Sequence, residues 1–145
     1  MDLTDKVAIV TGGTRDIGRA AVLRLGAEGA KVAINYCHSK EQGEATLAVL
    51  EAAGGTGVLI GGDMTNSQDV DALVRETCAA FGDRIDILVN NVGGLVARMP
   101  IAEMDQEFFD TVMRLNLTST FLTTHRALAH MGAGGSIVNL ASQAG

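Results

Sequence analysis

The sequence predicts an α/β protein with a doubly wound parallel sheet in three αβα layers, and three observations lead to this prediction. Short apolar runs alternate with longer helical patterns, which is typical of repeated strand–helix–strand units. A glycine-rich turn joins the first apolar run to the first helical pattern. Hydrophobic residues make up 47% of the chain and aromatic residues only 3%, which favours a core of small aliphatic side chains. The length of 145 residues predicts one domain, 1–145.

The first strand and its turn organise the rest of the chain. We expect a strand at Val7–Val10, then a loop of small and polar residues, then a helix with an apolar stripe formed by Ile17, Ala21 and Leu25. The loop region holds three glycines that allow positive φ or the close approach of another backbone, namely Gly12, Gly13 and Gly18. Because free N–H groups at a helix start favour an anion, this pattern predicts a dinucleotide-binding turn.

The same alternation predicts the following elements. Further strands are expected at Lys31–Asn35, Gly57–Gly61, Ile85–Val89 and Ser136–Leu140. Two helices are expected to begin with capping boxes, at Ser39–Gln42 and Thr65–Gln68. The stripes expected to face the sheet are Ala45, Ala48, Val49 and Ala52 on the first helix, and Val70, Leu73, Val74, Cys78 and Phe81 on the second.

The longest helical pattern covers residues 105–131 and carries two stripes. One contains Phe109, Val112, Met113, Asn116 and Thr120. The other repeats every seven residues and contains Phe108, Leu115 and Leu122. One stripe is expected to face the sheet, and the other to form a subunit interface or to be covered by a helix of the same chain. We therefore expect a homo-oligomer that associates through residues 105–131.

Charge and composition exclude several classes of partner. The net charge is −6 without a cluster of Lys or Arg, which argues against nucleic acid or an anionic membrane as the main partner. The chain has neither an apolar run of about 18 residues nor a signal-peptide pattern, so we expect a cytoplasmic protein. Cys37 and Cys78 are expected to be reduced thiols, and the three histidines lack metal-ligand spacing, so no metal is predicted.

Five motifs follow the expected elements in order. They are TGGTRDIG after the first strand, Asp63 after the third, NNVG at 90–93 after the fourth, Asn116 in the long helix, and GSIVNLASQAG closing the chain. Together they resemble the short-chain dehydrogenase/reductase family, in particular its 3-oxoacyl carrier-protein reductase-like members. The resemblance covers all 145 residues and implies a Rossmann-type fold. We expect strand order 3-2-1-4-5, with the apolar fifth strand as an edge that makes this chain alone prone to aggregation.

The resemblance also implies which residues bind the cofactor. Asp63 would receive the adenine amino group, although it could instead help cap the helix after Thr65. Asn90 and the backbone through Gly93 would lie against the ribose and lock the central strands. The full set implied is Gly12, Thr14, Arg15, Asp16, Ile17, Gly18, Tyr36, Ser39, Asp63, Met64, Asn90, Val92 and Gly93.

Two residues are implied in catalysis. Asn116 falls on an apolar stripe, so its amide is expected to be buried and partnered. In the family this Asn, through a bent helix and a bound water, holds the catalytic lysine in a proton relay; a structural Asn is the alternative. The counterpart of Ser142 donates a hydrogen bond to the substrate oxygen. Ser142 is not expected to be a nucleophile, because no His follows it and no GxSxG motif surrounds it.

The sequence departs from the family pattern in two places. Asp16 replaces the second glycine of the turn, and we expect its carboxylate to point away from the diphosphate and to cap the helix. The family's Tyr-x-x-x-Lys pair follows the serine, whereas this chain ends at Gly145. The spacing of Tyr36 and Lys40 matches that pair, but both lie at the adenosine end of the expected site and are rejected for this role. The chain thus resembles the first five strands of a longer enzyme.

These observations together predict an NADP(H)-dependent carbonyl reductase or alcohol dehydrogenase that acts on a small molecule and that is catalytically incomplete as given. NADP(H) is expected over NAD(H), because the second strand ends without a carboxylate and Arg15, Ser39 and Lys40 can face a 2′-phosphate. The alternative is a protein that binds a dinucleotide without turnover. A methyltransferase is disfavoured, because it would carry an acid where Asn35 and Tyr36 stand. The sequence does not specify the substrate.

Overall fold

The computed structural model describes residues 2–142 and confirms the predicted alternation of strands and helices. The first half contains β1 (Val7–Val10), α1 (Asp16–Ala27), β2 (Lys31–Tyr36), α2 (Lys40–Ala52), β3 (Thr56–Gly61) and α3 (Ser67–Phe81). The second half contains β4 (Ile87–Asn90), a 3₁₀ turn (Ile101–Glu103), α4 (Gln106–Met113), a π-helical turn (Arg114–Thr118), α5 (Ser119–Ala127), a second 3₁₀ turn (Leu128–His130) and β5 (Ser136–Asn139).

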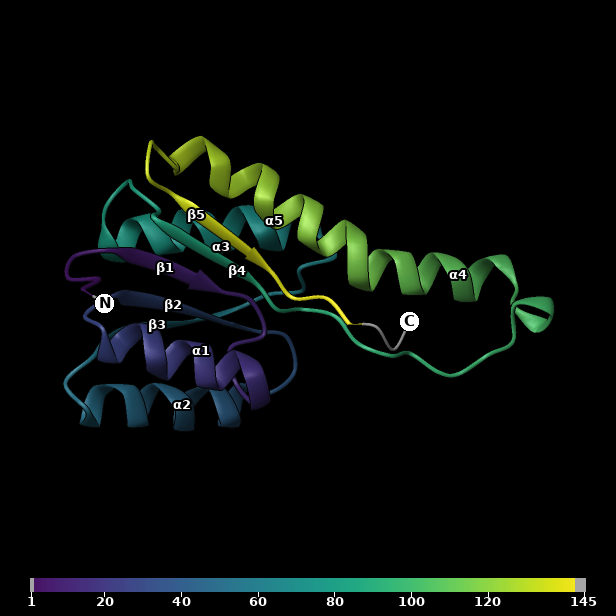
Figure 1. Ribbon diagram of the computed structural model, residues 1–145, viewed down its shortest axis with the longest axis horizontal. Helices are drawn as coiled ribbons and strands as arrows, with labels where there is room; N and C mark the ends of the chain where they lie inside the picture. The colour runs from purple at the N-terminus through teal and green to yellow at the C-terminus, as the bar shows by residue number, and fades with distance from the viewer. Residues whose placement is uncertain (1, 143–145) are drawn as a thin grey trace.

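The five strands form one parallel sheet in the order β3-β2-β1-β4-β5, as predicted. Val7 pairs with Lys31 of β2, and Ala8 pairs with Ile87 of β4, which places β1 at the centre. Helices α1 and α2 cover one face, and α3 and α5 cover the other (Figure 1). In the part of the chain that the structure describes, β5 forms one edge of the sheet, and Val138 is 47% exposed.

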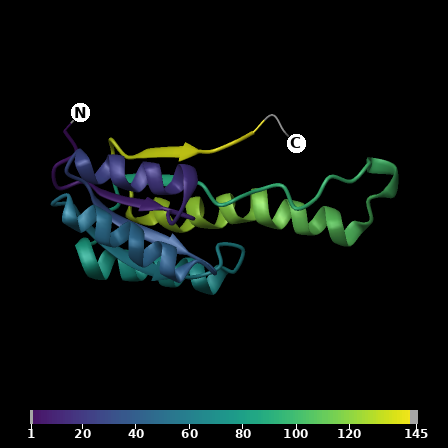
Figure 2. The same ribbon diagram turned by 90° about the horizontal axis from the view of Figure 1, so that it is seen from below.

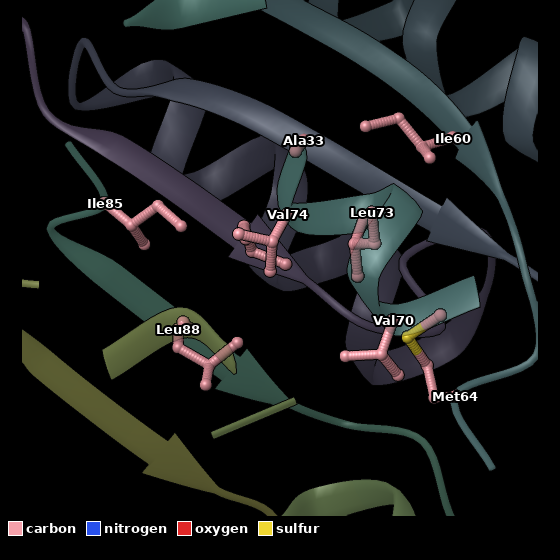
Figure 3. Close-up of a cluster of buried hydrophobic side chains, with 10 residues drawn as sticks. Ala33, Ile60, Met64, Val70, Leu73, Val74, Ile85 and Leu88 are labelled. Carbon is pink, nitrogen blue, oxygen red and sulfur yellow. The ribbon is translucent and has the colours of Figure 1, made fainter. Parts of the chain in front are cut away.

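Each face of the sheet has its own apolar core, because successive strand residues point to opposite sides. Ile9 points toward α3 and α5, whereas its neighbours Ala8 and Val10 point toward α1 and α2. Figure 3 shows the first core, in which side chains of α3 lie against the sheet. The residues labelled there are Ala33, Ile60, Met64, Val70, Leu73, Val74, Ile85 and Leu88.

The stripe predicted for α3 is confirmed, but those of α1 and α2 are wrong in phase. The buried residues are Gly18, Val22 and Gly26 on α1, and Gly43, Thr46 and Leu50 on α2. Ile17 is 64% exposed and Val49 is 43% exposed. A Cβ added to Gly26 would lie 2.1 Å from Leu50 Cδ1, so these two helices approach each other across a glycine. Hydrophobicity patterns miss such contacts, because they give glycine no weight.

The predicted capping boxes are also corrected. Helix α3 is capped by Asn66 rather than Thr65, and the Asn66 side chain accepts hydrogen bonds from the N–H groups of Gln68 and Asp69. Ser39 does occupy the N-cap position of α2, but its hydroxyl lies 2.7 Å from the Thr14 hydroxyl and makes no capping bond.

The long helical segment predicted for residues 105–131 is confirmed for residues 106–130, which are helical without a break although not α-helical throughout. The π-helical turn joins α4 to α5, and this segment, with the loop before it, extends beyond the sheet (Figure 2). The repeat of Phe108, Leu115 and Leu122 is half-buried, and Leu122 packs against the core below α5, so this repeat does not form the exposed face. The exposed apolar side chains are Phe109, Met113, Leu117, Phe121 and Leu128.

Candidate functional site

The carboxyl ends of the parallel strands meet at one edge of the sheet, which is the usual place for ligands in open α/β folds. The glycine turn after β1, Asp63 after β3, Asn90 at the end of β4 and Ser142 after β5 all follow the strands on this side (Figure 1). The fold therefore brings together most of the residues that the resemblance implies.

Asn91 holds the glycine turn in place. Its side-chain Nδ2 donates to the carbonyl oxygens of Thr11 at 3.1 Å and Gly12 at 3.0 Å. A Cβ on Gly18 would lie 2.2 Å from the Gly12 oxygen and 2.6 Å from Asn91 Nδ2, so only glycine fits there. Gly12 has a φ of +60°, which also favours glycine. Asn91 was not predicted individually from the sequence, although it stands in the NNVG motif.

Thr11 was missed as well. Its hydroxyl accepts hydrogen bonds from the N–H groups of Asn91 at 3.0 Å and Val92 at 3.1 Å. The Thr11 N–H donates to the Val89 oxygen at 3.0 Å. The ends of β1 and β4 are therefore bonded to each other at the point where the turn begins. The position of Thr11 directly before two glycines was the available signal.

Asn35 fixes the other side of the turn from within the core. It is 1% exposed, and its Oδ1 accepts from Gly12 N–H at 3.2 Å, while its main-chain oxygen accepts from Gly13 N–H at 3.0 Å. Its Nδ2 donates to the Gly62 oxygen at 3.0 Å. These bonds occupy the N–H groups of Gly12 and Gly13 at the beginning of the turn. The N–H groups at the start of α1 are not used by Asn35 and remain at the edge of the sheet.

The start of α1 fits an anionic group. Its N-cap residue is Arg15, whose side chain makes no capping hydrogen bond. The first N–H groups of the helix therefore lack the side-chain acceptor that an N-cap residue usually supplies. Asp16 is not the N-cap that we expected but the first helical residue, with a φ of +48° in the left-handed region. Its side chain is 85% exposed and lies 3.8 Å from Arg15 Nε. The carboxylate therefore extends into solvent without capping the helix.

The side of the edge where the resemblance implies the adenosine is formed by the ends of β2 and β3. Thr14 is buried, with its hydroxyl on Ser39 and its carbonyl oxygen accepting from the Thr46 hydroxyl at 3.0 Å. The half-buried Tyr36 ring lies over Gly61, where an added Cβ would come within 2.9 Å of its hydroxyl oxygen. Partial desolvation raises the pKa of the Cys37 thiol, although this residue is largely exposed. The nearby negative charges of Asp63 and Asp69 raise the pKa further.

Asp63 is exposed at this edge and already takes part in the local turn. Its Oδ1 accepts from Thr65 N–H at 2.8 Å, and its own N–H donates to Asp69 Oδ2 at 2.8 Å. Asp63 thus bonds within the loop before α3 but does not cap that helix, whose N-cap is Asn66, so the capping role that we kept as an alternative is wrong. Met64 is 1% exposed in the core below α3, so only its backbone can reach a ligand.

Asn90 locks β4 to its neighbours, as the resemblance implies. It is 3% exposed, and its Nδ2 donates to Asn139 Oδ1 at 2.8 Å and to Thr124 Oγ1 at 3.0 Å. Its Oδ1 accepts from the Thr123 hydroxyl. The side chain thus joins β4, β5 and α5.

Asn116 is exposed, and our expectation that its amide is buried is wrong. It lies in the π-helical turn, where its Oδ1 accepts from Gly94 N–H at 2.8 Å and its Nδ2 donates to the Gly94 oxygen at 3.1 Å. Nδ2 also donates to the Val112 oxygen at 3.0 Å. A Cβ on Gly93 would lie 2.9 Å from Asn116 Oδ1. The amide therefore finds its partners in the loop after β4 rather than in the core.

Ser142 is exposed and follows β5 at the same edge of the sheet. The Leu140 N–H donates to the Asn90 oxygen at 3.0 Å, which keeps the segment before Ser142 beside β4. The last three residues of the closing motif, 143–145, lie outside the described residues.

Fold and site together define a Rossmann-type α/β protein with a glycine turn at the carboxyl edge of its sheet. The model of the short chain dehydrogenase family matches residues 6–145, and the chain belongs to this family of oxidoreductases. It is 39% identical over 145 residues to a 3-oxoacyl-[acyl-carrier-protein] reductase of Synechocystis, covering 99% of this chain and 58% of the relative. A hydroxynaphthalene reductase of Aspergillus fumigatus is 35% identical over 142 residues, covering 98% of this chain and 51% of the relative.

Solved structures of the family agree closely with the fold. A short-chain dehydrogenase of Burkholderia cenocepacia in complex with NADP has a TM-score of 0.90 at 36% identity, with 99% of this chain and 58% of that chain covered. A short-chain dehydrogenase/reductase of Serratia marcescens has a TM-score of 0.92 at 36% identity, with 98% and 57% covered. This chain therefore spans a little over half the length of these relatives. No helix within residues 2–142 is long and apolar enough to cross a membrane.

Proposed function

We propose that this chain is the dinucleotide-binding part, formed by residues 1–145 as one domain, of a cytoplasmic NADP(H)-dependent carbonyl reductase or alcohol dehydrogenase. A bound nicotinamide would supply the hydride that moves to or from a carbonyl carbon. The observation that supports this proposal most is that Asn35 and Asn91 fix a glycine turn, from two sides, beside a helix start without a side-chain cap. The family match supports the same class of reaction.

Different residues at the edge would bind different parts of the cofactor. The turn from Gly12 to Gly18 and the first N–H groups of α1 would hold the diphosphate. Asp63 has a second carboxylate oxygen for the adenine amino group, because the turn uses Oδ1. The backbone from Asn90 to Gly93 would lie along the ribose. Ile17 is exposed beside the turn, Tyr36 stands at the end of β2, and Met64 and Val92 contribute backbone or packing contacts.

The preference for NADP(H) is supported by charge at the end of β2. This strand ends in Asn35 and Tyr36, so no carboxylate stands where it would repel a 2′-phosphate. The Arg15 side chain is 79% exposed in the turn, and its only described ion pair is the 3.8 Å contact with Asp16. A guanidinium can donate two parallel hydrogen bonds to phosphate. The Ser39 hydroxyl, which bonds to Thr14, would add a further contact from the start of α2.

Titrating both cofactors into this chain tests the preference. NADPH is expected to bind more tightly than NADH, and Arg15→Ala should weaken NADPH binding by about 1.5–3 kcal/mol while leaving NADH nearly unchanged. Arg19→Ala, one turn further along α1 and also exposed, is the matched control. Equal affinities for the two cofactors, or a loss that is the same for both, would contradict the proposal.

For catalysis we propose that Ser142 polarises the substrate oxygen by donating a hydrogen bond. Asn116 would act as a positioning residue, because its side chain is fully used on Gly94 and Val112 and only its backbone remains for a relay. The 145 residues alone are expected to bind cofactor without turnover, because loss of a general acid costs about 10²–10⁴-fold in rate. Steady NADPH consumption with a panel of carbonyl compounds would contradict this.

We also propose that the protein is a homo-oligomer that uses residues 105–131. Phe121 is 60% exposed and Leu117 is 57% exposed on the outer side of this segment. Light scattering should show that Phe121→Glu shifts the chain toward the monomer, whereas Thr111→Glu, at an exposed polar position of the same segment, should not. An unchanged mass in the Phe121 variant would rule out this interface.

A further inference from the structure

A second group of chemically active side chains lies at the opposite edge of the sheet. Within residues 2–142, Cys78, Asp83 and His130 bring one potential ligand atom each to within 4.8 Å of one another. Cys78 lies near the end of α3, and Asp83 lies in the connection between α3 and β4. His130 is the last residue of the 3₁₀ turn before β5. Both connections lie where the strands begin, away from the glycine turn (Figure 1).

The backbone holds these three residues together independently of their side chains. Gly82, with a φ of +100°, ends α3 by donating its N–H to the Cys78 oxygen at 2.8 Å, which turns Asp83 back toward the helix. Ile85 N–H donates to the His130 oxygen at 3.0 Å. The backbone that carries Cys78 and His130 is therefore held by hydrogen bonds on both sides of the group.

A single ring nitrogen of His130 faces both other groups. Its Nδ1 lies 3.6 Å from Cys78 Sγ and 2.7 Å from Asp83 Oδ1. A catalytic Cys–His–Asp relay needs opposite ring nitrogens for the thiol and the carboxylate, so this arrangement is not a nucleophilic triad. Three donors that converge on one point are instead the geometry that a metal ion requires.

The separation of Cys78 and His130 agrees with a tetrahedral zinc site, whereas that of Asp83 and His130 is shorter than such a site requires. With Zn–S near 2.3 Å and Zn–N near 2.0–2.1 Å, the S···N edge of a tetrahedron is about 3.6 Å, which matches the Cys78–His130 separation. The corresponding N···O edge is about 3.3 Å, so the Asp83 carboxylate must move outward by about 0.6 Å. Its side chain is 86% exposed and free of the core, whereas that of His130 is only 30% exposed.

We propose that Cys78, Asp83 and His130 bind one Zn²⁺ ion, with water as the fourth ligand. Thiolate, imidazole and carboxylate together form a donor set that suits zinc. On binding, the thiol proton of Cys78 passes to solvent as the Zn–S bond forms, and Nδ1 coordinates through its lone pair. The ion would tie the start of β4 to the segment before β5, at the end of the sheet remote from the glycine turn.

Sequence spacing could not indicate this site, because Cys78 and His130 are 52 positions apart. The other cysteine offers a matched control. Cys37 Sγ lies 3.3 Å from His38 Nε2, but within the described residues this exposed pair is not part of a group of three ligands.

The test is titration of the metal-free, reduced chain with Zn²⁺ by calorimetry, and with Co²⁺ by absorption, since a thiolate ligand gives cobalt a charge-transfer band. We expect one Zn²⁺ per chain with micromolar or tighter affinity. Affinity should fall about 100-fold or more in Cys78→Ser, Asp83→Asn and His130→Gln, because even loss of a group behind a ligand costs about 10–100-fold. Cys37→Ser should bind as tightly as the unaltered chain.

Several outcomes would overturn the proposal. They are absence of Zn²⁺ binding at micromolar concentrations, unchanged affinity in Asp83→Asn and His130→Gln, or loss of the cobalt band in Cys37→Ser instead of Cys78→Ser. Asp83→Asn keeps the test decisive if the other variants fold poorly, because this side chain is almost fully exposed. Zn²⁺ should also raise the melting temperature of the unaltered chain and leave that of Asp83→Asn unchanged.

Discussion

The sheet region, residues 2–92 and 119–142, and the arm, residues 93–118, use apolar side chains in opposite ways. In the sheet region they fill two cores, and Ile9, Leu73 and Leu88 are 0–1% exposed. In the arm no residue is buried, and Ile101 is 84% exposed and Leu117 57% exposed. An apolar stripe in the sequence therefore predicts that a surface will be covered. Which part of the protein covers that surface depends on what the tertiary structure places opposite the stripe.

The largest difference between the two regions is expected from truncating core leucines. Leu73→Ala should lower the free energy of unfolding by about 2–5 kcal/mol, because it leaves a cavity beneath α3. Denaturant unfolding followed by circular dichroism measures the change. A loss below 1 kcal/mol would show that the core is less tightly packed than the structure indicates.

Replacing one glycine in each region by alanine extends the comparison to backbone contacts. Gly18→Ala should lower stability by about 1–3 kcal/mol, because its Cβ would meet the Gly12 oxygen and the Asn91 amide. NADPH affinity should fall at least about tenfold, which corresponds to 1.4 kcal/mol. Gly94→Ala, in the arm, is the matched control, since its Cβ would meet no atom within 4 Å. Equal losses for the two variants would contradict the geometry of the turn.

The buried Asp86 extends the comparison to pH. Burial raises its pKa, but hydrogen bonds from Val7 N–H, Arg84 and Lys6 outweigh this effect and hold the pKa below its ordinary value. Its contribution is therefore present above about pH 4 and is lost as pH falls through the lowered pKa. Asp86→Asn should cost about 1–3 kcal/mol at pH 7 and flatten the acid side of the stability profile. If Asp86→Asn lost stability with falling pH in the same way as the unaltered chain, Asp86 would not be the source of this pH dependence.

Asp16 lies where the sheet region meets the cofactor edge, and a smaller effect is expected there. Asp16→Gly should raise stability by about 0.5–1 kcal/mol, since relief of the left-handed conformation exceeds the added chain entropy. It should also tighten NADPH binding by removing a negative charge. Asp16→Asn separates the two effects, because it removes the charge and keeps the φ. If only Asp16→Gly tightened binding, the backbone and not the charge would be responsible.

The smallest effect is expected in the arm. Leu117→Ala should change the free energy of unfolding of the monomer by less than about 0.5 kcal/mol, because the side chain has little burial to lose. Unfolding of the variant at low protein concentration, compared with Leu73→Ala, is the measurement. A cost of 2 kcal/mol would mean that the arm packs against another surface in solution.

The sequence by itself determined the parallel sheet and the glycine turn, because each depends on local patterns that alternate regularly along the chain, and the family resemblance implied the strand order. It also identified the family. The tertiary structure decided which face of α1 and α2 is buried, because Gly26 allows a contact with Leu50 that no hydrophobic pattern records.

Only the fold could show that the Asn116 amide is bonded to Gly94, 22 positions away, and that Asn35 and Asn91 hold the turn from two sides. The same holds for the meeting of Cys78 with His130. The physical reason is common to all of these cases. Polar side chains take whichever partners the packed backbone brings within about 3 Å, and those partners are distant in sequence.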